Sequence, residues 1–160
     1  AHGVPAGLGE PVFDKLDATL SHALMSIGAV KGIEFGAGFE VAHMMGSECN
    51  DESYLDPETG RVAFYSNHAG GILGGISNGD EIRIRLAIKP TPTVSVKQRA
   101  VNVETMEDSI LEPITRRDAT LLSRIYPVCE AMARIALLDA IMMAKGYAAI
   151  SHLDPKWDRI

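Results

Sequence analysis

The chain has 160 residues, 46% of them hydrophobic, and a formal net charge of −6. We expect residues 1–160 to form a single domain, because this length and composition suffice for one hydrophobic core. The negative charge argues against nucleic acid or an anionic membrane surface as the main partner, and no apolar run approaches the roughly 20 residues of a membrane span.

The first predicted element is a helix between residues 11 and 28. Pro11 suits a first helical position, and Gly28 is a plausible end. Between them, apolar residues recur at helical spacing: Leu16, Leu20, Ala23, Leu24 and Ile27. Residues 30–35 are typical of a strand that residues 36–38 close. Residues 39–45 then predict a short helical turn that brings Met44 and Met45 inward.

The middle of the chain predicts short strands and turns. Residues 47–60 are polar and contain a strong turn signal at residues 56–60, which indicates a surface loop or hairpin. Residues 61–65 predict a short strand. In residues 81–88 isoleucine and leucine alternate with arginine, which is typical of a half-buried strand. Residues 94–103 are more weakly β-like.

A long second helix is predicted over residues 120–146, with Gly146 at its end. Its apolar stripe is Val128, Met132, Ile135, Leu138 and Met142. Two long helices with several antiparallel strands predict an α+β fold in which helices pack against antiparallel sheets.

A glycine-rich run, residues 66–79, precedes the predicted strand at 81–88 and the segment Lys89, Pro90, Thr91, Pro92 and Thr93. Two readings stay open on physical grounds. Exposed backbone N–H groups, a lysine and threonine hydroxyls suit an anionic, phosphate-bearing ligand. Glycines also form tight hairpins that bind nothing, and residues 77–80 have the composition of a turn.

The run SNHAGGILGGISNG, with a strand and KPTPT after it, resembles the chorismate synthases. The resemblance extends to GLGEPVFDKLDA at residues 7–18, to MSIGAVKGIEFG at residues 25–36, and to Gly46-Ser47 with residues 50–52. It covers nearly all of this chain and about the second half of the family's usual length. We therefore expect the C-terminal half of a chorismate synthase.

The resemblance implies a lyase of aromatic amino-acid biosynthesis. Its substrate would be 5-enolpyruvylshikimate 3-phosphate, which loses phosphate in an anti 1,4-elimination that gives chorismate. The cofactor would be reduced FMN (FMNH2), without net redox change, and the family is also associated with NADP. The implied fold is a helical layer between antiparallel sheets, assembled as a homotetramer in the cytoplasm.

The resemblance also assigns site residues. Gly28, Ala29 and Gly74 would line the flavin, although the family has Asn at the position of Gly28. The phosphate or ribityl chain of the flavin would be held by Lys89, Pro90, Thr91, Pro92 and Thr93. Arg116 would contact the isoalloxazine, and Asp118 would be the catalytic residue near N5, where it could help relay a proton. From the residues alone, this Arg-Arg-Asp cluster could equally be a solvated loop.

Three positions depart from the family pattern: Arg117 replaces His, Ala119 replaces Pro, and Thr120 replaces Cys. The family's two catalytic histidines lie in its N-terminal half, and we expect His68 to support its loop. The histidines and the two cysteines, Cys49 and Cys129, show no metal-site or disulfide pattern. The alternative to an enzyme is a non-catalytic flavin-binding or assembly module that has lost the N-terminal catalytic half.

Overall fold

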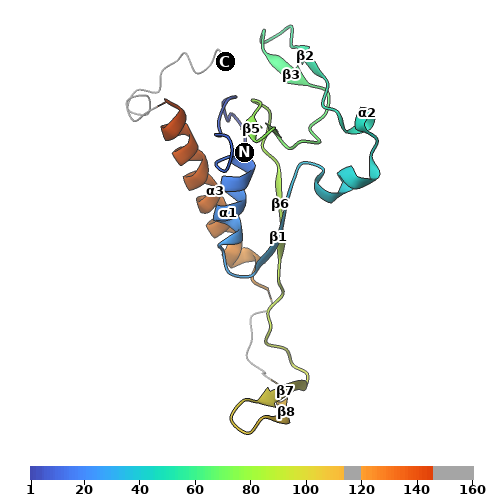
Figure 1. The fold of residues 1–160 in the computed structure, drawn as a ribbon, viewed down its shortest axis with the longest axis vertical. Helices are drawn as coiled ribbons and strands as arrows, with labels where there is room; N and C mark the ends of the chain where they lie inside the picture. Colours follow the sequence, from blue (N-terminus) through green and yellow to red (C-terminus); the bar gives the residue numbers. More distant parts are fainter. Residues whose placement is uncertain (114–119, 146–160) are drawn as a thin grey trace.

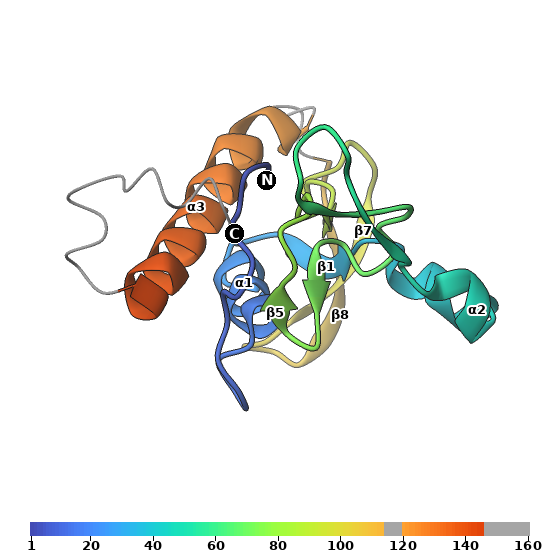
Figure 2. The same cartoon turned by 90° about the horizontal axis from the view of Figure 1, so that it is seen from above.

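The computed structural model describes residues 1–113 and 120–145. Helices α1 (Leu16–Met25) and α3 (Leu122–Lys145) lie side by side against the antiparallel pair of β1 (Val30–Phe35) and β6 (Ile84–Ile88) (Figures 1 and 2). The predicted α+β fold, with a helical layer against antiparallel strands, is confirmed. Every sheet in the described ranges pairs two strands. The other elements are η1 (Gly38–His43), α2 (Gly46–Cys49), β2 (Ser53–Leu55), β3 (Val62–Phe64), β4 (Ile72–Leu73), β5 (Ile76–Ser77), β7 (Gln98–Asn102) and β8 (Glu107–Leu111).

Helix α1 begins later than predicted, at Leu16 and not near Pro11. The preceding segment is held as a loop, because the backbone N–H of Leu16 donates to the carbonyl of Gly75 at 2.8 Å and that of Glu10 donates to Asp14 at 2.9 Å. The helix also ends earlier, at Met25, with Ser26 as its C-cap. The predicted apolar stripe is confirmed for its three leucines. Leu16, Leu20 and Leu24 are buried, and the first two join the core formed by Val4, Leu8, Ile72 and Ile82.

Strand β1 covers the predicted residues 30–35, and β6 occupies the second half of the predicted strand 81–88. The ladder runs from Val30 opposite Ile88 to Phe35 opposite Ile84, with an irregularity after Val30. Along residues 82–88 the isoleucines and leucine are buried or half-buried, whereas both arginines are exposed. The alternation therefore identified the inward face correctly.

The segment after β1 forms the predicted short turn, η1, but its methionines do not both point inward. Met45 is 66% exposed and Met44 is half-buried. The predicted hairpin is confirmed as β2 paired with β3, and its turn is fixed by Asp56, which accepts hydrogen bonds from Glu58 N and Thr59 Oγ1.

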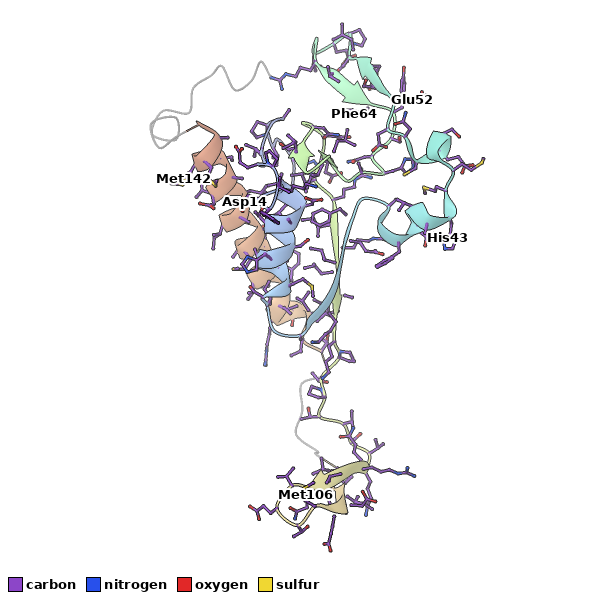
Figure 3. The ribbon with its side chains drawn as sticks, viewed as in Figure 1. Asp14, His43, Glu52, Phe64, Met106 and Met142 are labelled. Atoms are coloured by element: carbon purple, nitrogen blue, oxygen red, sulfur yellow. The ribbon has the colours of Figure 1, made fainter. Side chains whose placement is uncertain are left out.

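The β-like segment 94–103 is confirmed in part, as β7. Its partner β8 was not predicted, because the sequence Glu-Asp-Ser-Ile-Leu has a low average strand propensity. The two strands form an arm that extends away from the helices, with Met106 at its far end (Figures 1 and 3). An ion pair between Lys97 and Glu112 closes its base at 3.0 Å.

The long helix α3 is confirmed, but the predicted stripe is not the face that packs inside this chain. Ala133, Ala136, Leu137, Ala140 and Ile141 pack against the core. Val128, Ile135 and Leu138 of the predicted stripe are exposed. Pro127 lies inside the helix. The predicted helix end, Gly146, lies outside the described residues.

Candidate functional site

The glycine-rich run folds as a tight hairpin against the rest of the chain. Gly74 and Gly75 form the turn between β4 and β5 with φ of +61° and +88°, as a two-residue hairpin of this type requires. Earlier in the run, Gly70 crosses Gly36 so closely that a Cβ on Gly70 would lie 2.3 Å from the Gly36 nitrogen. Gly74 and Gly75 therefore form a tight hairpin turn, and Gly36 and Gly70 let two backbone segments cross in contact.

A buried carboxylate holds the start of the same run. The side chain of Asp51 is 2% exposed. It accepts hydrogen bonds from Ser66 Oγ at 2.6 Å and from the backbone N–H groups of His68 and Ala69, both at 2.8 Å. His68 Nδ1 lies 3.2 Å from the same carboxylate without meeting hydrogen-bond geometry. Asp51 is therefore a structural brace, and the expected loop-supporting role of His68 agrees with its position.

The environment of Asp51 favours its charged form. Burial alone would raise its pKa, but the hydrogen bonds from Ser66, Ala69 and His68, with the nearby His68 ring, outweigh burial and hold the pKa below its ordinary value. Asn67 completes the brace, because its side chain donates to Glu81 O at 2.8 Å and accepts from Gly71 N at 2.7 Å. Motif spacing in the sequence could not predict this hydrogen-bond network, because Asp51 and its partners are 15 to 18 residues apart along the chain.

Two of the predicted flavin-binding segments meet at the opposite end of the β1–β6 ladder. The backbone N–H of Lys89 donates to the carbonyl of Ala29 at 2.7 Å. Ala29 has φ of +72°, a conformation that costs a non-glycine residue about 1–2 kcal/mol. Such outliers persist where the surroundings impose them and are enriched at functional sites. Gly28 beside it is exposed, and a Cβ added there would meet no atom within 4 Å.

The segment after β6 also meets the beginning of α3. Lys89, Pro90 and Thr91 line a cavity of about 190 Å³ together with Ile88 and residues 120–122. The hydroxyl of Thr120 accepts a hydrogen bond at 3.2 Å from the backbone N–H of Leu122, the first residue of α3. A helix N-terminus carries partial positive charge and N–H groups that suit a phosphate. The cavity thus combines a lysine, a threonine and a helix start, which the sequence alone did not place together.

A larger cleft of about 490 Å³ continues from this cavity, and both are lined by Ile88 and Leu122. Its walls are mostly apolar side chains of α1, β6 and α3, including Leu24, Leu86 and Ile125. An apolar cleft with a polar end has the lining that an organic phosphate requires, and the small cavity has room for one end of such a ligand.

One predicted flavin-binding residue, Gly74, lies away from this cavity. Gly74 lies beside the beginning of α1, because Gly75 accepts the hydrogen bond from Leu16, whereas Gly28 follows the end of the same helix. Ten helical residues, about 15 Å, separate the two. Arg116 and Asp118, with Arg117 and Ala119, lie outside the described residues. In the described part of the chain, no cluster of three or more metal-ligating side chains occurs and no helix is long and apolar enough to cross a membrane.

Comparison with known proteins gives one consistent family. The chorismate synthase family model matches residues 1–142. A chorismate synthase of Acetivibrio thermocellus is 65% identical over 161 residues, which cover 100% of this chain and 41% of the relative. One from Archaeoglobus fulgidus is 54% identical over 143 residues, covering 89% of this chain and 39% of the relative. A crystal structure of chorismate synthase matches with a TM-score of 0.71 and 33% identity, covering 91% of this chain and 36% of that chain.

The chain thus spans about two fifths of the length of the curated relatives it matches. That it corresponds to their C-terminal half stays a prediction. The family match includes the hairpin of the glycine-rich run, the junction of Ala29 with Lys89 and most of α3. The chain belongs to the chorismate synthase family.

Proposed function

We propose that this chain supplies the flavin-phosphate-binding part of a chorismate synthase. The whole protein would convert 5-enolpyruvylshikimate 3-phosphate to chorismate and phosphate with reduced FMN. In this elimination the C–O bond to phosphate and one ring C–H bond break, and a second ring double bond forms. Phosphate and a proton are released and no net oxidation occurs, so the reaction balances without an added oxidant.

One observation carries the proposal. The hydrogen bond from Lys89 N to Ala29 O joins two segments that the family resemblance assigns to the flavin, residues 28–29 and 89–93. These segments are 60 residues apart in sequence, and the β1–β6 register brings them together. Leu122, at the beginning of α3, lines the same cavity and follows Asp118 by four residues in sequence.

The residues present suit the phosphate end of FMN. The Lys89 ammonium would pair with the phosphate, the Thr91 hydroxyl would donate to one of its oxygens, and the α3 N-terminus would add favourable partial charge. Bound reduced FMN would supply the electron-rich ring system that the elimination needs, and the protein would position and charge the site around it. By resemblance, Arg116 and Asp118 would lie on the ring side of this cavity.

Flavin binding tests the phosphate site directly. The chain would be titrated with FMN and, separately, with riboflavin, which lacks the phosphate, and binding would be followed by flavin fluorescence. We expect Lys89→Ala to weaken FMN binding about tenfold or more, because a charge-assisted hydrogen bond is lost, and to leave riboflavin binding unchanged. Lys97→Ala is the matched control, since it removes the same charge at the base of the arm.

Two results would contradict the phosphate site: FMN and riboflavin that bind alike in the unmodified chain, or equal effects of the two lysine substitutions. Catalysis needs a second assay, in which phosphate release from 5-enolpyruvylshikimate 3-phosphate is measured anaerobically with pre-reduced FMN and a no-flavin control. Flavin-dependent release by the 160 residues would show a working site within them. FMN binding without release would leave the chain as a binding part that requires the rest of the enzyme.

A further inference from the structure

Tyr126 is the one aromatic residue among the described residues that line the larger apolar cleft. It lies on α3 about one helical turn after Leu122, and Leu122 lines both this cleft and the small cavity that contains Lys89. Tyr126 is 69% exposed, so most of its surface is open to another molecule. In Figure 1 the beginning of α3 lies beside the end of β6, the strand that leads into Lys89. An open aromatic surface thus lies next to the proposed phosphate site.

The position of Tyr126 on the helix directs it along the cleft. In the first turns of α3 the residues that line the cleft are Leu122, Ile125, Tyr126, Cys129, Glu130 and Ala133. They recur with three- and four-residue spacings, which places them on one face of the helix. Leu122 and Tyr126 are four residues apart, and residues at this spacing are neighbours on a helix surface. A ligand that extends from the small cavity into the cleft therefore passes Leu122 first and reaches Tyr126 next.

The rest of the cleft suits the uncharged part of a ligand. Its walls from α1 and β6 are aliphatic, as at Leu24 and Leu86. The one acidic side chain in its described lining, Glu130, forms an ion pair with Arg134 one turn further along α3, so its charge is compensated. No lysine or arginine is among the described residues that line it. A phosphate would find its cation at Lys89 in the small cavity, whereas a flat ring suits a cleft of aliphatic side chains and one tyrosine.

The aromatic ring of Tyr126 suits a flat heterocycle, because aromatic side chains bind such rings by stacking. We propose that Tyr126 stacks on the isoalloxazine ring of the flavin whose phosphate lies at Lys89. This inference rests on the proposed function for the identity of the ligand. It adds a flavin contact outside the motifs to which the family resemblance assigns site residues. In the competing arrangement Tyr126 is a packing residue, covered by another part of the protein, and never meets the flavin.

Fluorescence of the bound flavin tests the contact. The 160-residue chain would be titrated with oxidised FMN and, separately, with riboflavin. A phenol in contact with an oxidised flavin quenches its fluorescence by electron transfer, and a phenyl ring does not. Tyr126→Phe should therefore at least double the fluorescence of the bound flavin and change its affinity less than twofold, because the stacked ring is kept. Tyr126→Ala should weaken the binding of FMN and of riboflavin alike, by about three- to tenfold, because the ring is lost.

Tyr65→Ala is the matched control. Tyr65 is 72% exposed, stacks on Tyr54 with ring centroids 4.5 Å apart, and does not line the cleft. It follows β3, which Figure 1 shows at the other end of the molecule from the beginning of α3. Its substitution removes a tyrosine of similar exposure and should change neither the affinity nor the fluorescence of the bound flavin.

Unchanged fluorescence of the flavin bound to Tyr126→Phe would overturn the ring contact, and so would equal affinities of Tyr126→Ala and Tyr65→Ala. The two proposals fail separately, because Lys89→Ala should weaken FMN only, whereas Tyr126→Ala should weaken both flavins. Tyr126 effects on both flavins without a Lys89 effect would sink the phosphate site and support the ring contact. A Lys89 effect without Tyr126 effects would do the reverse, and no binding of either flavin would overturn both. Tyr126→Phe keeps the ring and its packing, so its fluorescence change reports contact with the flavin and not damage to the fold.

Discussion

The two ends of the β1–β6 ladder are built differently. At one end, beyond Phe35, backbone crosses backbone at Gly36 and Gly70, and the carboxylate of Asp51 satisfies the N–H groups of the next turn. At the other end, beyond Val30, the exposed Lys89 lies beside Ala29, and the backbone of Ala29 has a left-handed conformation. The first end is held by crossed backbones and by hydrogen bonds to a buried carboxylate, whereas the second combines a strained residue with a cation beside a small cavity.

This difference separates residues that maintain the fold from residues available to a ligand. At the crossing of Gly36 and Gly70 the two backbones lie in contact, so substitutions of these glycines should change stability. Gly28 and Lys89 at the other end are exposed, so substitutions of these two residues should change binding while the fold is kept. The motif resemblance covers both ends of the ladder and does not reveal which end maintains the fold and which is available to a ligand.

The largest effect is expected for Gly70→Ala. The added Cβ would lie 2.3 Å from the Gly36 nitrogen, and φ at this position is +69°. Backbone strain and overpacking together should lower the free energy of unfolding by about 4 kcal/mol or more. Gly28→Ala is the matched control at the other end, with open space around its Cβ, and should change stability by less than about 0.5 kcal/mol. Urea denaturation of both variants measures the difference, and similar losses would contradict the comparison.

Asp51→Asn should cost about 2 kcal/mol at pH 7, because the amide presents a donor to N–H groups that need an acceptor. The pKa of Asp51 is lowered in the folded chain, so its contribution is present above the ordinary value, about 3.9, and is lost as pH falls through the lowered one. The stability gap between the unmodified chain and the variant should therefore narrow below about pH 4. Denaturation curves at pH 7 and pH 3 test this, and a gap of constant size would exclude the charged carboxylate as the brace.

Local patterns predicted much of the fold, and the failures concern long-range contacts. Residues 30–35 were identified as a strand because glycines bound a short run that contains valine, isoleucine and phenylalanine. The length of α3 was also predicted, yet its inward face was not, since helical spacing produces two apolar stripes on this helix and only the position of α1 selects between them.

The candidate site was predictable to a similar degree. Resemblance supplied Ala29 and Lys89 as members of one site, and their contact follows from the pairing of β1 with β6. The role of Asp51 had no sequence signal, because a brace of this kind is defined by partners that only the folded chain brings near. Thr120 was considered as a departure from the family pattern and not as a residue that lines the cavity and accepts a hydrogen bond from Leu122.

A smaller effect, of opposite sign, is expected for Ala29→Gly. Glycine adopts a φ of +72° without a Cβ penalty, so the substitution should stabilise the chain by about 0.5–1 kcal/mol after its entropy cost. Ala23→Gly, inside α1, is the matched control and should destabilise by about 1 kcal/mol. Thermal melts of the two variants should shift in opposite directions. A loss of stability in both would mean that Ala29 is not strained.

The smallest effect on stability is expected for Lys89→Ala. This variant should separate ligand binding from stability most clearly, because it should weaken FMN binding and leave the fold unchanged. The side chain is exposed at the end of β6, so its removal should change the free energy of unfolding by less than about 0.5 kcal/mol. The hydrogen bond to Ala29 uses the backbone N–H, which alanine retains, so the junction of the two segments is preserved. Denaturation should therefore be unchanged in the same preparation in which FMN binding is weakened. A stability loss as large as that of Asp51→Asn would make Lys89 a structural residue, and the weakened binding would then report damage to the fold.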